Sequence, residues 1–176
     1  MAEIERTRVR ERGPLADNAY ERVMKMRQEF HERQHVGPVV IKPSDRQWEL
    51  TRQGKLLFYL HPDMHKETPL QDWLVFSLDI QTHSGKHRHQ GGLAIYVLEG
   101  KGYTILDGER VDWGEGDLIL LPIKPEGVEH QHFNSEPGKP CRWVAFLYLP
   151  IMDYVAMEMT QGELSPEFQR QAGGAA

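Results

Sequence analysis

Hydrophobic positions recur with helical spacing near the start of the chain. Between residues 17 and 35, apolar side chains fall about every 3.6 residues, and Asp17 is a suitable N-terminal cap. Gly37 and Pro38 follow and favour the end of a helix. The pattern predicts an amphipathic helix whose apolar stripe must pack on the outside of the domain or on a second subunit.

After Pro38 the pattern changes to short runs of β-branched and aromatic residues, separated by Pro, Gly and Asp. The pair Asp107-Gly108 is a hairpin signal. Many short strands at regular spacing favour an antiparallel sandwich or barrel, so we expect an all-β fold. The expected strands are residues 39–41, 55–60, 73–80, 93–98, 103–106, 117–121, 128–133 and 142–149.

These patterns divide the chain into three parts. Residues 1–38 form a charged N-terminal arm followed by the amphipathic helix, and residues 39–150 form the β-barrel. Pro150 is expected to end the last strand. Residues 151–176 are expected to contain a short helix, near 152–159, and a polar tail.

Composition narrows the possible functions. The 176 residues fit one domain, and the formal net charge of -5 argues against a broad nucleic-acid-binding face. No stretch approaches the roughly 18 apolar residues of a membrane span, and the charged start does not resemble a signal peptide. The single cysteine, Cys141, excludes an internal disulfide. We therefore expect a soluble, cytoplasmic protein that binds neither nucleic acid nor a membrane.

Two histidine pairs carry the chemistry, His87-Arg88-His89 and His130-Gln131-His132. Residues i and i+2 of a strand share a face, so each pair aims two imidazoles at the same side of a sheet. Neutral imidazole is a good ligand for Fe, Zn, Cu, Ni and Mn. One such pair alone also fits surface histidines on an exposed strand, whereas two pairs favour a metal site inside a barrel.

Two longer motifs surround these pairs, and together they resemble the cupin superfamily. The first, G-x5-H-x-H-x3/4-E-x6-G, is matched by His87, His89 and Gly100. The second, G-x5-P-x-G-x2-H-x3-N, is matched by Gly116, Pro122, Gly127, His130 and Asn134. The resemblance covers residues 73–150 and implies a double-stranded β-helix, the cupin or jelly-roll barrel, with the N-terminal helical arm and a short C-terminal helix outside it.

The chain departs from these motifs at two places. Leu93 stands where the first motif has its glutamate, and Glu99 lies too far along the strand to replace that carboxylate. Residues 123–126 are an insertion that lengthens a loop near the barrel mouth. A cupin that has lost its metal is one interpretation, but the three histidines of the motifs remain.

A site of three histidines without a carboxylate is similar to that of gentisate-type ring-cleaving dioxygenases. The stretches 96–104 and 116–122 resemble those enzymes, which have an apolar residue at the position of Leu93. The resemblance implies Fe(II) held by His87, His89 and His130, although Zn, Mn, Ni or Cu would also bind such a site. Those enzymes usually contain two cupin domains, and this chain has one.

The resulting hypothesis is an Fe(II)-dependent dioxygenase that uses O2 to cleave a hydroxylated aromatic compound or a similar chelating organic acid. His132 is expected to act as an acid/base or substrate hydrogen-bonding group, with a fourth ligand or a barrel-lining residue as alternatives. The competing hypotheses are a non-redox metal-binding cupin (an isomerase, a lyase or a small-molecule sensor) and a structural cupin without metal.

Other features are assigned structural roles. His61 and His65 flank Pro62 and are expected in a loop, and His83 at a pocket rim. The apolar strand near residues 143–149 is expected to supply core packing rather than a substrate cage. Because the amphipathic helix has no obvious partner within the barrel, we expect a homodimer or larger homo-oligomer in which this helix packs across a subunit boundary.

Overall fold

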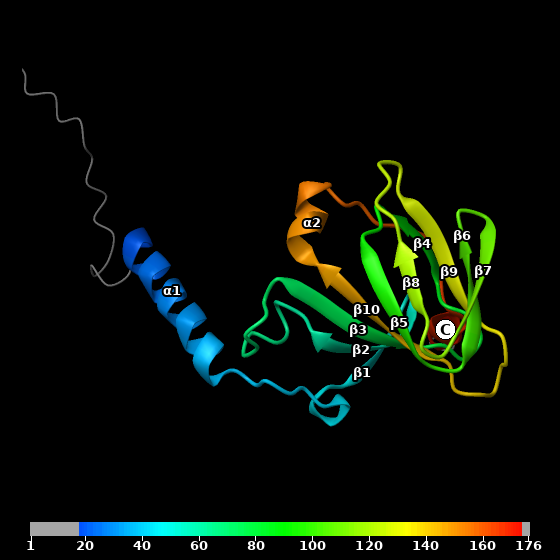
Figure 1. The fold of residues 1–176 in the computed structure, drawn as a ribbon, viewed down its shortest axis with the longest axis horizontal. Coiled ribbons are helices and arrows are strands. Elements are labelled where there is room, and N and C mark those ends of the chain that lie inside the picture. The colour runs from blue at the N-terminus through cyan, green and yellow to red at the C-terminus, as the bar shows by residue number, and fades with distance from the viewer. Residues whose placement is uncertain (1–17, 174–176) are drawn as a thin grey trace, which may run out of the picture. The chain divides into compact units, whose positions relative to one another are not determined.

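A computed structural model describes residues 18–173 in two compact units (Figure 1). One unit comprises residues 18–39 and 67–69, and the other comprises residues 40–66 and 70–173. The charged arm expected at the N-terminus and the expected cap Asp17 lie outside the described residues. No helix within residues 18–173 has both the length and the apolar character needed to cross a membrane.

The first unit is built on α1 (Ala19–Val36), which confirms the helix predicted from the apolar periodicity. The Asn18 side chain caps it by accepting a hydrogen bond from the Glu21 backbone N–H at 3.0 Å. At the other end the side chain of Gln34 donates to the Pro69 carbonyl at 2.7 Å. No residue of α1 is buried, and Tyr20 on its apolar stripe remains 70% exposed.

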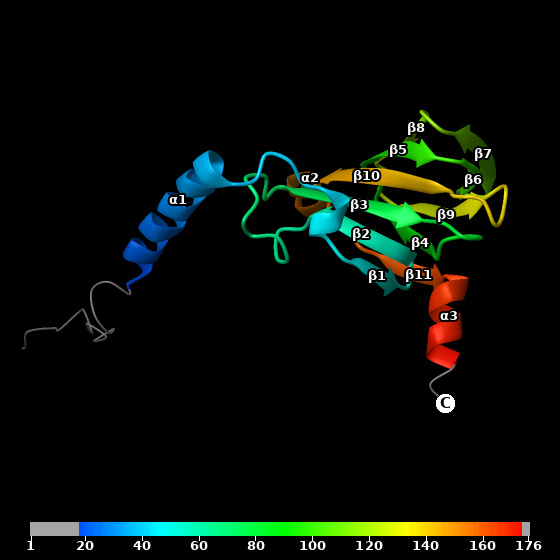
Figure 2. The same ribbon diagram turned by 90° about the horizontal axis from the view of Figure 1, so that it is seen from below.

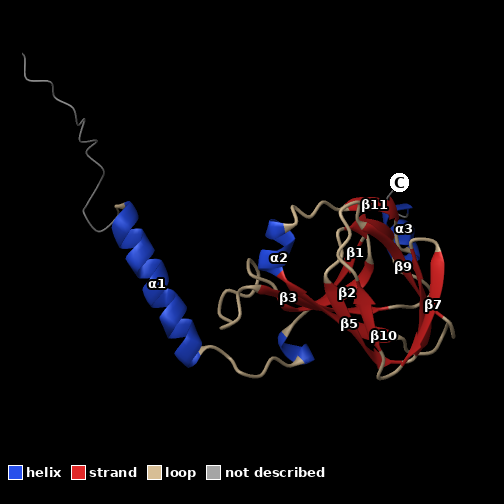
Figure 3. Cartoon of the chain, turned by 45° about the horizontal axis from the view of Figure 1, so that its top comes forward, coloured by secondary structure: helices blue, strands red, loops and turns tan. Residues whose placement is uncertain are grey.

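The second unit is mostly β and consists of two antiparallel sheets that face each other (Figures 1 and 3). The six-stranded sheet has the order β1 (Trp48–Thr51), β2 (Gly54–Leu60), β3 (Trp73–Asp79), β10 (Arg142–Tyr148), β5 (Leu93–Glu99), β8 (Leu118–Leu121). The five-stranded sheet has the order β11 (Thr160–Glu163), β4 (Lys86–His89), β9 (Val128–Asn134), β6 (Lys101–Leu106), β7 (Glu109–Gly114). This two-sheet arrangement confirms the all-β sandwich expected from the sequence.

The strands alternate between buried and exposed side chains because one face of each sheet lies against the other. In β10, Trp143, Ala145 and Leu147 are buried while Phe146 and Tyr148 are exposed. The hydrophobic core between the sheets contains the following buried residues: Leu56, Leu78, Ile80, Leu93, Ile95, Val97, Trp113, Ile119, Leu121, Cys141, Trp143, Ala145 and Leu147.

The structure corrects the sequence interpretation at both ends of the barrel. Residues 39–41 form no strand, and Val39 is 95% exposed; proline on both sides restricts this segment, which runs into a short 3₁₀ helix, η2 (Pro43–Asp45). The strands β1 and β7 were not expected, because their polar residues hide the alternation. β10 ends at Tyr148, close to Pro150 as expected. The helix expected near residues 152–159 instead begins earlier, as α2 (Leu149–Tyr154), with Pro150 in its first turn.

The expected polar tail is largely structured. Its residues form β11, which pairs with β4, and then α3 (Pro166–Gly173), as Figure 2 shows. The backbone N–H of Ser165 donates to the Arg52 carbonyl at 2.9 Å, and α3 packs against β1 and β2. Short polar segments of this kind are stabilised by pairing with strands that are distant in the sequence. They therefore need no apolar periodicity of their own, and the sequence pattern does not reveal them.

An exposed apolar patch lies on the outer face of three neighbouring strands, β10, β5 and β8, of the six-stranded sheet. It is formed by Tyr96 on β5, Leu118 and Leu120 on the edge strand β8, and Phe146 on β10. Tyr96 lies opposite Leu118 in the register, and Ala94 lies between Leu120 and Phe146. A cluster of exposed apolar side chains at a sheet edge favours association with another surface.

We expect Gly102→Ala to destabilise the fold, because a Cβ at this position of β6 would overlap the Trp113 ring and the Phe133 carbonyl oxygen. Overpacking of this kind costs about 1–3 kcal/mol. Urea denaturation would measure the loss. Gly114→Ala, on the paired strand, is the matched control, because its nearest neighbour would be the Lys101 side chain at 3.9 Å. Equal stability of the two variants would contradict the steric argument.

Candidate metal centre

The histidine pairs lie on two neighbouring strands. β4 and β9 are antiparallel, and His87 lies directly opposite His130. Since alternate residues share a face, His89 and His132 point to the same interior side as that pair. Side chains opposite each other in an antiparallel pair have close Cβ atoms, so the register brings imidazoles from both motifs together.

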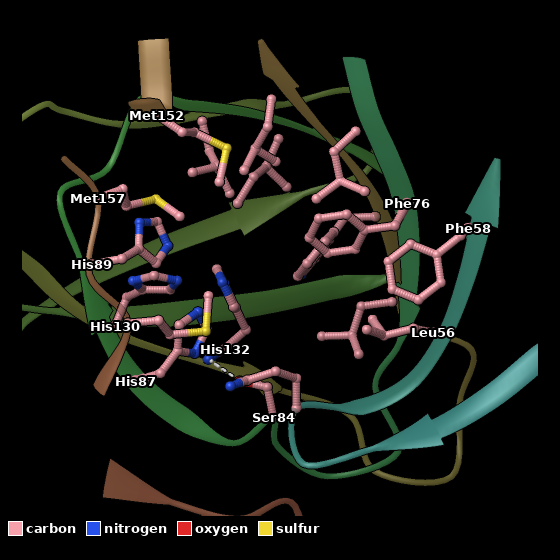
Figure 4. A pocket seen from close by; sticks show the side chains of 18 residues that line it. Leu56, Phe58, Phe76, Ser84, His87, His89, His130, His132, Met152 and Met157 are labelled. Carbon is pink, nitrogen blue, oxygen red and sulfur yellow. Dashed lines mark hydrogen bonds between the residues drawn. The ribbon is translucent and has the colours of Figure 1, made fainter. Parts of the chain in front are cut away.

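Three of the imidazoles form a compact cluster. One ring nitrogen of each of His87, His89 and His130 lies within 4.8 Å of the others. The ring centroids of His87 and His130 are 4.1 Å apart, and those of His89 and His130 are 4.8 Å apart. His132 lies beside the cluster, with its ring centroid 5.4 Å from that of His130 (Figure 4).

Burial keeps these imidazoles uncharged at neutral pH. It lowers the pKa of His132 to about 3, with smaller contributions from His87 and His89. It also lowers the pKa of His87 and of His89 to about 4, and His89 adds to the effect on His87. The pKa of His130 lies well below its usual value, because of burial first and neighbouring histidines second. Neutral imidazoles have the lone pair that a metal ion requires.

The hydrogen bonds of the rings test whether a metal ion fits. His130 Nδ1 lies 3.2 Å from the Val128 carbonyl oxygen, which accepts its proton and leaves Nε2 free to bind. His87 Nδ1 is buried and makes no well-formed hydrogen bond within residues 18–173, although the backbone of Gly85 partly offsets the lowering of the pKa of this ring. The Gly91 N–H donates to His89 Nδ1 at 3.0 Å, so binding through Nε2 requires the ring proton to move to Nδ1 and this bond to break. The donor set fits a first-row metal ion, with that one rearrangement at His89.

His132 is held by contacts with residues outside the histidine cluster. Its Nδ1 lies 2.8 Å from the Thr104 hydroxyl, and its backbone N–H donates to the Ser84 hydroxyl at 2.9 Å. Trp143 packs against the ring at a centroid distance of 5.0 Å. The side chain is fully enclosed by these contacts and the cavity, so its orientation is fixed.

The four histidines line one side of a cavity of about 190 Å³ (Figure 4). Leu56, Phe58 and Phe76 lie on the opposite side, and Met152 and Met157 approach the histidines from the C-terminal segment. No Asp, Glu, Lys or Arg is among the residues that line this cavity in the described chain. Apart from the histidines, its polar lining residues are Gln53 and Ser84.

The segment after β10 forms part of the cavity wall. Met152, Met157 and Met159 all line it, and the Glu158 N–H donates to the Gln90 side chain at 2.8 Å. Beyond this segment β11 pairs with β4, where Lys86 and Glu163 form an ion pair of 2.8 Å. Sequence patterns gave no sign of this wall, because Met152 lies in a helix of six residues and the other two methionines lie in the loop that follows it.

Of the residues at which the sequence departs from the motifs, some line the cavity and others do not. Leu93 is buried and lines the cavity, so an apolar side chain stands on the inner face where the motif has glutamate. Glu99 lies at the far end of β5 and does not line the cavity. Lys124, in the inserted loop, forms an ion pair of 2.7 Å with Asp107 instead of lining the cavity.

The remaining candidates have structural contacts. His83 lies 3.2 Å from the Gln131 side-chain nitrogen and packs on the Phe133 ring, outside the cavity lining. His61 lies in the loop directly after β2, as expected. The apolar strand β10 has a second role beyond the expected core packing, because Trp143 and Leu147 also line the cavity.

Comparisons with known proteins agree with this architecture. The family model described as "Cupin domain" matches residues 74–147. A gentisate 1,2-dioxygenase from Ralstonia sp is 37% identical over 70 residues, which is 39% of this chain and 19% of that protein. The chain therefore spans less than a fifth of the length of this relative.

Two solved structures share the fold. A salicylate 1,2-dioxygenase variant from Pseudoaminobacter salicylatoxidans, in complex with gentisate, is 19% identical with a TM-score of 0.50; the match covers 80% of this chain and 36% of that chain. The polyketide cyclase RemF from Streptomyces resistomycificus is 20% identical with a TM-score of 0.52, over 73% of this chain and 88% of that chain.

We expect the metal-free protein to lose stability as the pH falls from about 6.5 to 4. The clustered histidines have pKa values near or below 4 when folded but about 6.5 when unfolded, so only the unfolded chain takes up protons in this window. Each such histidine contributes a slope of up to about 1.4 kcal/mol per pH unit. Urea denaturation at several pH values measures the slope.

A matched pair of variants identifies the source of this slope. His89→Gln removes one buried imidazole and should make the slope shallower, whereas His35→Gln, on exposed α1, should leave it unchanged. A wild-type free energy of unfolding that is constant between pH 6.5 and 4.5 would contradict the prediction.

Proposed function

Because residues 74–147 form a cupin domain with a three-histidine cluster, we propose that this protein is an Fe(II)-dependent dioxygenase acting on a hydroxylated aromatic compound or a similar chelating organic acid. The observation that carries the proposal is the position of the cluster. It lies at one end of an apolar cavity, and Leu93 occupies the carboxylate position on the inner face.

In this proposal His87, His89 and His130 hold the metal ion from one side. Three neutral imidazoles leave the ion its full positive charge and up to three open positions, which suits a bidentate anionic substrate together with O2. When bound, Fe(II) supplies a path for electron density between the chelated substrate and dioxygen. The same ligands accept Zn, Mn, Ni or Cu, so the donor set alone does not select iron.

The cavity supports a small substrate. Its volume of about 190 Å³ is slightly larger than an engineered apolar cavity of about 150 Å³ that binds benzene in another protein. A single aromatic ring with a few substituents therefore fits, with its chelating edge at the histidines and its apolar edge toward Phe58 and Phe76. These side chains also exclude water from the reacting end, which strengthens electrostatic interactions there.

We assign His132 to substrate binding or proton transfer. It lines the cavity next to the cluster but does not belong to the three histidines whose ring nitrogens converge. Its ring is held by Thr104 and Trp143, so it presents a fixed polar group to a ligand bound at the neighbouring metal.

The alternative is a metal-binding cupin without redox chemistry, such as an isomerase, a lyase or a small-molecule sensor. One observation favours it: no cationic side chain lines the cavity in the described chain, so the metal alone would balance the charge of an acidic substrate. A neutral ligand with a carbonyl or hydroxyl group would bind without such a partner.

The dioxygenase proposal predicts oxygen consumption. Protein purified anaerobically and loaded with Fe(II) should take up O2 with at least one member of a panel of gentisate, salicylates, catechols and hydroquinones. An oxygen electrode measures the uptake, and ultraviolet absorption follows ring cleavage. Stoichiometric binding of another metal, with no uptake for any compound, would contradict the dioxygenase and favour the non-redox alternative.

Two variants provide the control for this experiment. His89→Asn removes one of the converging imidazoles and should abolish both metal binding and O2 uptake. His35→Asn replaces an exposed histidine of α1 that does not line the cavity and should leave both unchanged. Metal binding by His89→Asn equal to that of the wild type would argue against the proposed ligand set.

We also propose that the chain forms a homo-oligomer in which α1 packs on a second copy. The apolar stripe of α1 and the patch formed by Tyr96, Leu118, Leu120 and Phe146 both remain exposed in the single chain. Burying such surfaces between copies removes apolar area from water, and each Å² buried lowers the free energy by about 25 cal/mol.

The oligomer predicts a mass above that of the 20.4 kDa chain in light scattering coupled to size exclusion. Leu120→Lys, at the sheet edge of the exposed patch, should lower the measured mass. The control Val111→Lys introduces the same charge at an exposed position of the other sheet and should have no effect. A wild-type mass equal to one chain would contradict the proposal.

A further inference from the structure

A row of buried polar groups continues from the histidine cluster across the five-stranded sheet. Thr104 on β6 lies opposite His132 on β9. Trp113 lies on the next strand, β7, opposite Gly102 and thus diagonal to Thr104. The Thr104 hydroxyl is 2.8 Å from His132 Nδ1 and 2.9 Å from Trp113 Nε1. All three residues are buried, with exposed fractions of 1% for Thr104, 2% for His132 and 6% for Trp113.

The direction of these hydrogen bonds follows from the chemistry of each group. The indole N–H of Trp113 is only a donor, so the Thr104 oxygen accepts that bond. The hydroxyl has one proton of its own to donate. Within the described part of the chain its other side-chain partner is His132 Nδ1, and a buried hydroxyl proton without an acceptor would destabilise the fold. The Thr104 proton is therefore donated to Nδ1.

We propose that Trp113 and Thr104 are positioning residues that hold His132 in the tautomer with its proton on Nε2. A neutral imidazole carries one N–H, so accepting at Nδ1 leaves the proton on Nε2. Thr104 does not line the cavity and His132 does, so Nε2 is the nitrogen left to the cavity side.

This arrangement decides between the roles considered for His132. A protonated Nε2 has no lone pair for a metal ion, and His132, unlike His89, is not among the three histidines whose ring nitrogens converge. His132 is therefore not a fourth ligand. It is a hydrogen-bond donor, and it selects a ligand with an acceptor oxygen next to the atoms that bind the metal. The identity of that oxygen as part of a chelating phenol or acid rests on the proposed function, whereas the tautomer does not.

The test is nuclear magnetic resonance of protein containing ¹⁵N-labelled histidine, with two-bond proton–nitrogen correlations that distinguish the tautomers. In the metal-free wild type, His132 should show a protonated Nε2 and an unprotonated Nδ1. Its signals are assigned by their contact with the Trp143 ring, whose centroid lies 5.0 Å away. A protonated Nδ1 would overturn the proposal.

Addition of Zn(II) separates the two possible roles in the same sample. His87, His89 and His130 should shift to metal-bound patterns while His132 keeps its Nε2 proton. Loss of that proton on stoichiometric Zn(II) binding would identify His132 as a ligand and overturn the proposal. No substrate or O2 is present, so failure of the dioxygenase proposal leaves this result unaffected, and the reverse also holds.

Variants of the row test its mechanism. Thr104→Ser retains the hydroxyl and should preserve the Nε2–H tautomer, whereas Thr104→Val should produce a mixture of tautomers. Trp113→Phe keeps the hydroxyl but removes the donor, which frees the Thr104 oxygen to accept from Nδ1 and should also give a mixture. A pure Nε2–H tautomer in folded Thr104→Val would show that the row does not position the ring. If the larger changes prevent folding, the wild-type and Thr104→Ser spectra still decide.

Discussion

The antiparallel register between β4 and β9 is the constraint on which the site depends. With His87 opposite His130, the two-residue alternation of each strand places all four imidazoles on the interior face. A shift of one residue in this register would turn one pair toward solvent. The neighbouring pairings, β11 with β4 and β6 with β9, hold both strands from their outer sides. The position of the histidines is therefore set by backbone pairing across the whole sheet.

The interior that surrounds the histidines is strongly apolar, and this has electrical consequences. Burial lowers the pKa of each imidazole far below neutrality, so the four rings stay close without mutual charge repulsion. A cation bound among them would then be the dominant local charge, because no charged side chain lines the cavity in the described residues. Ligand selection accordingly depends on the metal, on the donor or acceptor state of His132 and on the apolar wall.

Much of this fold and site could be predicted from the sequence, and the exceptions have physical causes. The alternation of apolar and polar residues, together with turn residues, identified most barrel strands. Because residues i and i+2 of a strand share a face, the sequence also placed His87 and His89 on one face, and His130 and His132 on one face. The strand predicted at residues 39–41 was wrong, because flanking prolines and the lack of a partner strand leave this apolar run exposed. The cavity wall from Met152 to Met159 depends on long-range contacts that leave no local pattern. The Thr104 hydrogen bond likewise requires the β6–β9 register.

The pairing of β11 with β4 also affects how the histidine-bearing strand moves. Without β11, β4 would be the terminal strand of its sheet, and terminal strands open more readily than central ones. The Lys86–Glu163 ion pair and the Gln161 side-chain bond to the Lys86 carbonyl at 3.1 Å fasten this added strand. The C-terminal segment thus lowers the frequency of local opening at His87 and His89. The rigidity of the imidazole cluster is consequently linked to residues more than seventy positions later in the chain.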